Sequence, residues 1–304
     1  MRKEFCRLVE KLALIDDKII FLSGDLGYNA FENIQSSLGE RFINCGVAEQ
    51  SMIGIASGLA KKGFKVFCYS IAPFIVYRCL EQIRNDVCFH NLPVFIVGNG
   101  GGYGYGIMGS SHHTLSDIAS VSSLPNITIW TPDSVNRIDF ILDSILKNNS
   151  PAYLRLASDE SENSNFNIQG SFNIINNCGS DTTVIALGFL MNRVVDVVNN
   201  EKIFDQINIL SCIKFPISLS KELLLVFQKT KKILVIEDHV SVGGLSQQLL
   251  HELTLKNIKI SSFINLCAEE YPSGLYGNQD FHLKESGLDK LNIKRIILNI
   301  MNTN

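Results

Sequence analysis

The sequence lacks the cysteine and histidine patterns that mark disulfide frameworks and the common zinc sites. Its eight cysteines are scattered over 304 residues with no Cys-x-x-Cys pair, and no His-Glu-x-x-His motif is present. Scattered cysteines are typical of reduced thiols in a cytoplasmic protein. His112 and His113 are adjacent, so their side chains point in different directions and cannot easily serve one metal ion. We therefore expect no metal ion bound by this chain's own side chains.

Features that would indicate a membrane or a nucleic-acid partner are also missing. The net charge is −3, and the one tight basic cluster, Lys229, Lys231 and Lys232, is typical of a solvated helix end. No apolar run reaches membrane-spanning length. The first six residues, MRKEFC, are charged and do not resemble the start of a signal peptide. We expect a cytoplasmic protein that binds neither nucleic acid nor a membrane.

The composition is that of a globular protein with room for two cores. Hydrophobic residues make up 46% and charged residues 19% of the chain. Short apolar runs that alternate with helical periodicity predict a mainly parallel sheet with helices on both faces. The expected strands of the first half are 18–23, 41–45, 65–69, 93–98, 127–130 and 152–156, and expected helices include 48–61, 74–89 and 134–148.

A polar, acidic stretch at 158–165 separates this pattern from a second one. The later expected strands are 183–187, 206–212, 232–237 and 258–264, with helices between them. The sequence therefore predicts an α/β protein of two domains, 1–157 and 171–304, joined by a linker at 158–170.

Glu49 is the first candidate for chemistry. It opens a helix rich in small residues and follows a short apolar strand that ends at Cys45 and Gly46. Apolar neighbours raise the proton affinity of a carboxylate, which suits an acid that shares a proton with a nitrogen heterocycle. The alternative is that Glu49 only complements the helix dipole in the first turn.

Six ordered segments carry a family resemblance. They are GVAEQ (46–50), GLAKKG (58–63), YSIAPF (69–74), RCLEQIRND (78–86), GSSHH (109–113) and LPNITIWTPD (124–133). Together they closely resemble the pyrimidine-binding domain of the transketolase family over residues 1–157. The remainder more weakly resembles the C-terminal domain of that family.

The resemblance implies a thiamine-diphosphate enzyme that transfers a two-carbon ketol unit from a ketose donor to an aldose acceptor. Glu49 would hydrogen-bond the pyrimidine ring nitrogen of the coenzyme and so activate it. Phe74 would stack on the pyrimidine, with Tyr77 as the alternative stacking residue, and Asp25 would lie at the cofactor edge. Phe74 could instead be a core aromatic of its helix.

Substrate residues follow from the same resemblance. His112 aligns with the family histidine that hydrogen-bonds the donor sugar, and His113 beside it is a second candidate. Arg155 falls where the family uses an arginine for the phosphate of a sugar substrate. Arg2 lies 23 residues before Asp25, and a similar spacing of arginine and aspartate frames the acceptor channel and the cofactor edge in the family. A loop histidine without a role and a solvated terminal arginine are the alternatives.

The glycine-rich stretch 104–109 matches Gly-x-Gly-x-x-Gly, the pattern of dinucleotide-binding sites. In those sites the motif starts directly at the end of a strand. Here residues 99–103 intervene after the expected strand, and bulky residues occupy the tight turn. The pattern therefore favours a mobile substrate loop that carries His112, and a nicotinamide-binding site is the less favoured alternative.

The first departure from the family pattern concerns the coenzyme diphosphate. The family binds diphosphate and Mg²⁺ through a Gly-Asp-Gly motif, and this chain has none; Ser-Gly-Asp-Leu at 23–26 is the nearest string. The resemblance then implies that Mg²⁺ and the diphosphate are held mainly by a separate N-terminal transketolase-like subunit. We expect a heterotetramer with two copies of each chain.

The second departure concerns the substrate. Ile107 and Met108 stand where ordinary transketolases carry an acidic residue, and glycines 100–102 replace a histidine. This change predicts a specialised sugar, with or without phosphate. Two alternatives stay open: the β-subunit of a 2-oxoacid dehydrogenase, and a non-catalytic assembly subunit.

Overall fold

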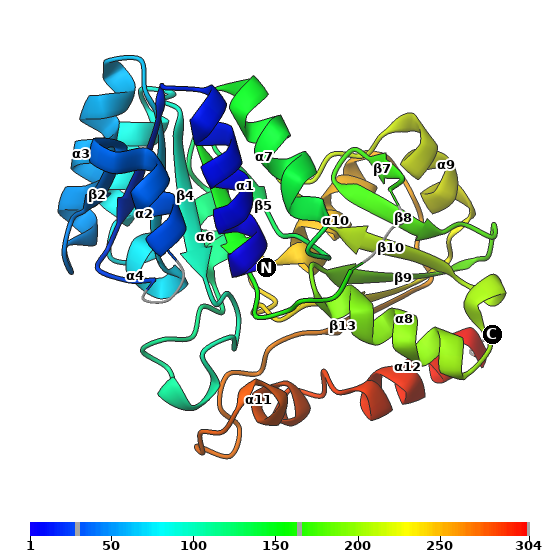
Figure 1. Ribbon diagram of the computed structural model, residues 1–304. Coiled ribbons are helices and arrows are strands. Elements are labelled where there is room, and N and C mark those ends of the chain that lie inside the picture. The colour runs from blue at the N-terminus through cyan, green and yellow to red at the C-terminus, as the bar shows by residue number, and fades with distance from the viewer. Residues whose placement is uncertain (28–30, 163–165, 303–304) are drawn as a thin grey trace.

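The computed structural model describes residues 1–27, 31–162 and 166–302, and it contains two sheets that are each covered by helices on both faces (Figure 1). Residues 163–165 of the expected linker lie outside the described residues. The predicted α/β class with two mainly parallel sheets is confirmed.

The first sheet has seven strands in the order β11-β5-β6-β4-β3-β1-β2. Its strands are β1 (Ile19–Ser23), β2 (Phe42–Asn44), β3 (Lys65–Ile71), β4 (Val94–Asn99), β5 (Thr128–Trp130), β6 (Ala152–Leu156) and β11 (Lys214–Phe215). All six strands expected from the first half of the chain are present, and they pair in parallel. The seventh, β11, comes from the second half and pairs antiparallel with β5.

Successive side chains along each strand point to opposite faces of the sheet and belong to two different hydrophobic cores. In β1, Phe21 belongs to the core beneath α1 and α2, whereas Leu22 belongs to the opposite core beneath α3. This alternation follows from the two-residue period of a strand, and burial of both faces explains why the strands are apolar throughout. The helices of this half are α1 (Arg2–Ile15), α2 (Glu32–Leu38), α3 (Glu49–Lys61), α4 (Ala72–Val76), α5 (Leu80–Gln82), α6 (Asp117–Ser122) and α7 (Arg137–Asn148).

The helix expected over 74–89 is wrong as a single element. The chain forms α4, then a turn, then α5, and then a π-helical segment at Ile83–Cys88. The turn at residues 77–79 separates Phe74 from the later helix. It also places Arg78 where its side chain reaches back to Glu49.

The second sheet has six strands in the order β13-β12-β9-β10-β8-β7. They are β7 (Ile168–Gln169), β8 (Phe172–Asn176), β9 (Thr182–Leu187), β10 (Asn208–Cys212), β12 (Lys232–Ile236) and β13 (Ser262–Leu266). The helices are α8 (Leu190–Asn200), α9 (Lys221–Lys229), α10 (Leu245–Leu255), α11 (Gln279–Glu285) and α12 (Lys290–Asn302). β7 begins inside the stretch expected to be linker, and the domain boundaries stay a prediction.

The two halves are joined by more than the linker. β11 extends the first sheet, and Arg155 at the end of β6 forms ion pairs with Asp117 of α6 and with Asp238, which follows β12. None of the helices within the described residues is long and apolar enough to cross a membrane.

Candidate functional site

Glu49 lies at the carboxyl edge of the first sheet, where ligands of parallel α/β sheets commonly bind. β2 ends at Asn44, and Gly46, with φ 70°, turns the chain into α3. That left-handed conformation is open to glycine at little cost. Glu49 is the first residue of α3 and is only 1% exposed. The hydroxyl of Ser70, near the end of β3, donates to its Oε1 at 3.0 Å.

The second oxygen of Glu49 accepts a hydrogen bond from Arg78 Nη1. The guanidinium carbon of Arg78 also lies 4.5 Å from the centre of the Phe74 ring. The neighbours of Glu49 are therefore not only the expected apolar ones, because a hydroxyl and a guanidinium hold the carboxylate. Arg78 was not singled out from the sequence, although its spacing of four residues from Phe74 is one that brings side chains together on a helix.

Glu49, Arg78 and Phe74 form a row of side chains in contact, and His112 extends this row beyond Phe74. Its ring centre lies 5.1 Å from that of Phe74 in an edge-on arrangement, and 5.9 Å from that of Tyr105. Nδ1 of His112 lies 2.9 Å from the hydroxyl of Ser111. The structure thus brings Glu49, Phe74 and His112 into one contiguous site, with Arg78 between the first two.

Tyr77 points to a different neighbour. Its hydroxyl lies 3.0 Å from Ser116 Oγ and accepts from the Ser116 N–H at 2.9 Å. Burial raises the pKa of Tyr77. Since Phe74 contacts both Arg78 and His112, Phe74 is better placed than Tyr77 to stack on a ring bound beside Glu49.

His113 is turned away from this row and is 3% exposed. Its Nε2 lies 2.7 Å from the carbonyl oxygen of Gly106, and its Nδ1 lies 2.9 Å from the hydroxyl of Tyr271. Burial lowers the pKa of His113 to about 4, so the ring is neutral near pH 7. These contacts fasten the glycine-rich loop to the C-terminal half, and we therefore assign His113 to loop packing and not to substrate.

Arg155 is also buried, with 4% exposure. Its Nε donates to Asp117 at 2.9 Å, its Nη1 donates to Asp238 at 3.0 Å, and its Nη2 donates to two backbone carbonyls. Burial disfavours its charge, but the two carboxylates raise the pKa of Arg155 above its ordinary value. Two carboxylates and two carbonyls hold the guanidinium inside the protein, so we revise the expected phosphate contact and assign Arg155 to the junction of the two halves.

The glycines after β4 allow close packing against that junction. A Cβ on Gly101 would lie 2.6 Å from Arg155 Cγ, and a Cβ on Gly102 would lie 1.8 Å from Asp238 Oδ2. Gly100 and Gly101 donate backbone hydrogen bonds to the carbonyl of Leu156. Residues 100–102, which precede the stretch expected to be a mobile loop, thus form a segment in which side chains would not fit.

Arg2 and Asp25 line different cavities. Asp25, at the end of β1, accepts from the side chain of Asn44 at 2.8 Å and lines a cavity of about 270 Å³. Arg2 lines a larger cavity of about 410 Å³ beside the row that contains His112. Arg2 and Asp25 therefore line separate cavities of this chain, and their expected places at the acceptor channel and at the cofactor edge stay predictions.

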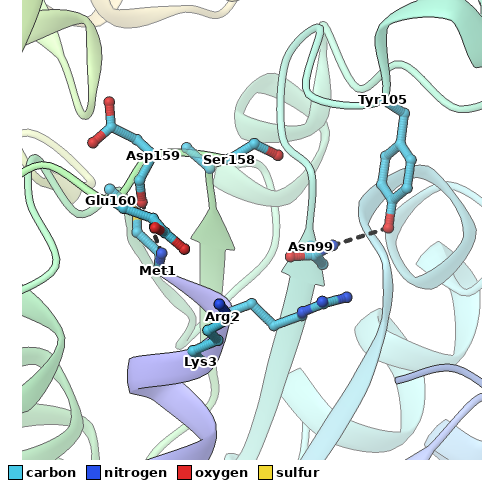
Figure 2. Close-up of a pocket in the computed structure, with 9 residues that line it drawn as sticks. Met1, Arg2, Lys3, Asn99, Tyr105, Ser158, Asp159 and Glu160 are labelled. Atoms are coloured by element: carbon cyan, nitrogen blue, oxygen red, sulfur yellow. Dashed lines mark hydrogen bonds between the residues drawn. The ribbon is translucent and has the colours of Figure 1, made fainter. Parts of the chain in front are cut away.

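Figure 2 shows the larger cavity between the start of the expected linker and the glycine-rich loop. The side chain of Arg2 extends past Asn99 toward the side where Tyr105 lies (Figure 2). The residues that line it are Met1, Arg2, Lys3, Asn99, Tyr105, Ala157, Ser158, Asp159 and Glu160. Within residues 1–27, 31–162 and 166–302, no cluster of histidine, cysteine and acidic side chains could hold a metal ion.

Comparison with known proteins gives matches over both halves. Residues 1–162 match the model of the transketolase pyrimidine binding domain. The chain is 29% identical over 306 residues to a subunit of the apulose-4-phosphate transketolase of Phocaeicola vulgatus, covering 98% of this chain and 96% of that protein. It is 30% identical over 313 residues to a putative transketolase C-terminal section of Methanocaldococcus jannaschii, covering 99% and 96%.

Among solved structures, a split-gene transketolase described as an inactive β4 tetramer has the same fold. The two chains superpose with a TM-score of 0.82 at 23% sequence identity, covering 99% of this chain and 97% of the other. The shared fold therefore includes the second sheet, where the sequence resemblance was weaker.

Proposed function

This chain belongs to the transketolase family, and on that premise we propose that it is the coenzyme-activating subunit of a split, thiamine-diphosphate-dependent transketolase. The resemblance predicted from the sequence motifs is confirmed. Both curated relatives described above are named as transketolase chains, which favours this function over the β-subunit of a 2-oxoacid dehydrogenase. The reaction would move a two-carbon ketol unit from a ketose to an aldose.

The contact of Arg78 with both Glu49 and Phe74 carries the proposal. A guanidinium is flat and cationic and donates N–H groups, and it lies over the Phe74 ring while bonding the buried Glu49 carboxylate. A pyrimidine protonated at its ring nitrogen is also flat and donates that N–H to a carboxylate, so the guanidinium stands in for that form of the ring. The residues present therefore fit the pyrimidine of thiamine diphosphate, which would displace Arg78 from Glu49.

When bound, thiamine diphosphate supplies a nucleophilic carbon that accepts the two-carbon unit. Glu49 would hold a proton at the pyrimidine nitrogen, and Ser70 would fix the carboxylate through Oε1. Phe74 would orient the ring. His112, beside Phe74, would hydrogen-bond the substrate; Ser111 holds its Nδ1, which leaves Nε2 to face the sugar.

A partner subunit would complete the site. The segment that contains Glu49 includes apolar side chains open to solvent, with Val47 before it 74% exposed and Ile55 of α3 46% exposed. A partner that carries the diphosphate and Mg²⁺ site would cover them, and two copies of each chain would form the heterotetramer. The inactive β4 tetramer of the structural relative supports a requirement for a second kind of chain.

A specialised sugar is the proposed substrate. One relative is named for apulose-4-phosphate as its sugar, which supports a substrate of this kind. In this chain Ile107 and Met108 are largely exposed apolar side chains where ordinary family members carry an acidic residue. Loss of that carboxylate changes which hydroxyl groups of the sugar the site can hydrogen-bond.

The experiment that tests this function uses the chain co-expressed with its diphosphate-binding subunit. The donors are fructose, xylulose, their terminal phosphates, hydroxypyruvate and pyruvate, and the acceptors are short aldoses and glycolaldehyde. We expect ketol transfer from at least one ketose and no oxidative decarboxylation of pyruvate. Turnover of pyruvate alone would support the 2-oxoacid dehydrogenase alternative, and inactivity with every donor would support an assembly subunit.

A further inference from the structure

Tyr105 and Asn99 form a polar pair in the cavity that contains Arg2 (Figure 2). Asn99 is the last residue of β4, and its side-chain N–H donates to the Tyr105 hydroxyl at 2.9 Å. The Tyr105 ring centre lies 5.9 Å from that of His112. Tyr105 therefore follows His112 in the series of ring contacts that begins at Phe74.

Gly100 makes room for this tyrosine. A Cβ on Gly100 would lie 2.3 Å from the Tyr105 ring, and φ at Gly100 is 74°. The Tyr105 ring thus fills the volume that a side chain at position 100 would need. The chain has placed a phenol, carried by the glycine-rich loop, directly over the end of β4.

The Tyr105 hydroxyl is able to donate a hydrogen bond to a ligand. It accepts from Asn99, and in the part of the chain that the structure describes no second hydrogen-bond partner is found for it. Burial raises the pKa of Tyr105, so the hydroxyl is protonated near neutral pH. A phenol can accept one hydrogen bond and donate another, and the donor is free to serve a ligand in the cavity.

We propose that Tyr105 is a specificity residue that donates a hydrogen bond to an oxygen of the part of the sugar that is not transferred. Asn99 is the positioning residue that keeps the Tyr105 proton directed at the cavity. The inference rests on the proposed ketol transfer. The row Glu49, Phe74, His112, Tyr105 then runs outward from the coenzyme, and the cavity takes the carbons beyond the two that move.

Donor and acceptor share this contact for a chemical reason. The bond broken in the ketose joins the two-carbon unit to the remaining sugar, and the bond formed with the aldose is of the same type. The departing aldehyde therefore leaves from the place that the acceptor aldehyde enters. A group that binds the remaining sugar acts on both long donors and long acceptors, and it does not act on substrates that lack those carbons.

The test uses Tyr105→Phe and Asn99→Asp in the complex with the diphosphate-binding subunit. The substrates are the fastest ketose of the panel described above and hydroxypyruvate. In hydroxypyruvate the two-carbon unit is joined only to a carboxylate, with no further sugar carbons. Loss of one hydrogen bond is expected to raise KM for the ketose about tenfold. KM for hydroxypyruvate should stay within about twofold, because that donor does not reach the cavity.

Asn99→Asp is nearly isosteric but cannot donate to the tyrosine. It should accept the Tyr105 proton and so reproduce the Tyr105→Phe effect on the ketose. Tyr276→Phe is the matched control, since Tyr276 donates to Ser110 of the same loop outside the cavity lining. That variant should leave both KM values unchanged.

Equal changes in KM for ketose and hydroxypyruvate would overturn the assignment of Tyr105, as would an unchanged ketose KM. An Asn99→Asp enzyme that behaves like wild type would overturn the positioning role of Asn99. A wild-type complex that transfers from none of the ketoses would contradict the proposed function and this assignment with it. The three outcomes that concern the variants leave the proposed function intact, so the two failures are distinguishable.

Discussion

Replacing Glu49 with glutamine is expected to lower turnover of the reconstituted complex about 10²- to 10⁴-fold, the usual contribution of a general acid–base group. Glutamine keeps the shape and the contact with Ser70 but cannot hold the acidic proton. Assembly with the partner should be unchanged by size-exclusion chromatography with light scattering. Turnover should be measured at saturating coenzyme, so that weaker coenzyme binding does not mask the effect.

Glu222→Gln is the matched control for the Glu49 variant. Glu222 lies in the first turn of α9 and is exposed, so it shares with Glu49 a favourable position in the helix dipole. If the dipole were the only role of Glu49, both variants would lose a little stability and keep their turnover. Near-normal turnover of the Glu49→Gln complex would remove Glu49 from the chemistry.

Arg155→Ala is expected to lower the free energy of unfolding by about 3–5 kcal/mol, because it leaves two buried carboxylates without their cation. Asp117 and Asp238 are fully buried on either side of the guanidinium. The loss should be visible as a shift of the denaturant midpoint of the isolated chain. Arg7→Ala removes an exposed pair with Glu4 and should cost at most about 1 kcal/mol.

The same variant separates a structural role from phosphate binding. A structural role predicts equal kinetic effects of Arg155→Ala on phosphorylated and unphosphorylated substrates in the complex. A selective rise in KM for the phosphorylated substrate, with stability unchanged, would restore Arg155 as a phosphate ligand. A normal denaturant midpoint would contradict the buried ion-pair account.

The strands and layers could be predicted because burial on both faces leaves a local signal. Each of the first six strands lies in a short apolar run, and these runs alternate with segments of helical periodicity in the sequence. β11 has two residues, and its partner β5 is far away along the chain. No local pattern indicates such a pairing. The sequence also does not show that the helix expected over 74–89 breaks at residues 77–79.

The site was partly predictable for a similar reason. Glu49, Phe74 and His112 belong to ordered motifs, and the structure places them side by side. Arg155 and His113 were identified by residue type and position, but burial depends on elements far along the chain, namely Asp238 and Tyr271. Arginine and histidine suit both ligand binding and buried packing, and only the tertiary structure separates the two.

Arg78, Asn99 and Tyr105 were missed because each acts through a neighbour that the fold supplies. Arg78 reaches Glu49 across a break in the helix, and Tyr105 reaches Asn99 only because Gly100 has no side chain. Such pairs are set by the turns that the backbone takes between elements. Those turns depend on packing that residue spacing does not show.

The central claim is that this chain supplies the pyrimidine half of a coenzyme site and that a second subunit supplies the diphosphate half. The most direct test is calorimetric titration of thiamine diphosphate with Mg²⁺ into the chain alone, and then into its complex with the diphosphate-binding subunit. The account predicts clear binding to the complex and none to the chain alone. Binding to the isolated chain as tight as to the complex, or none to a complex that turns over ketoses, would contradict it.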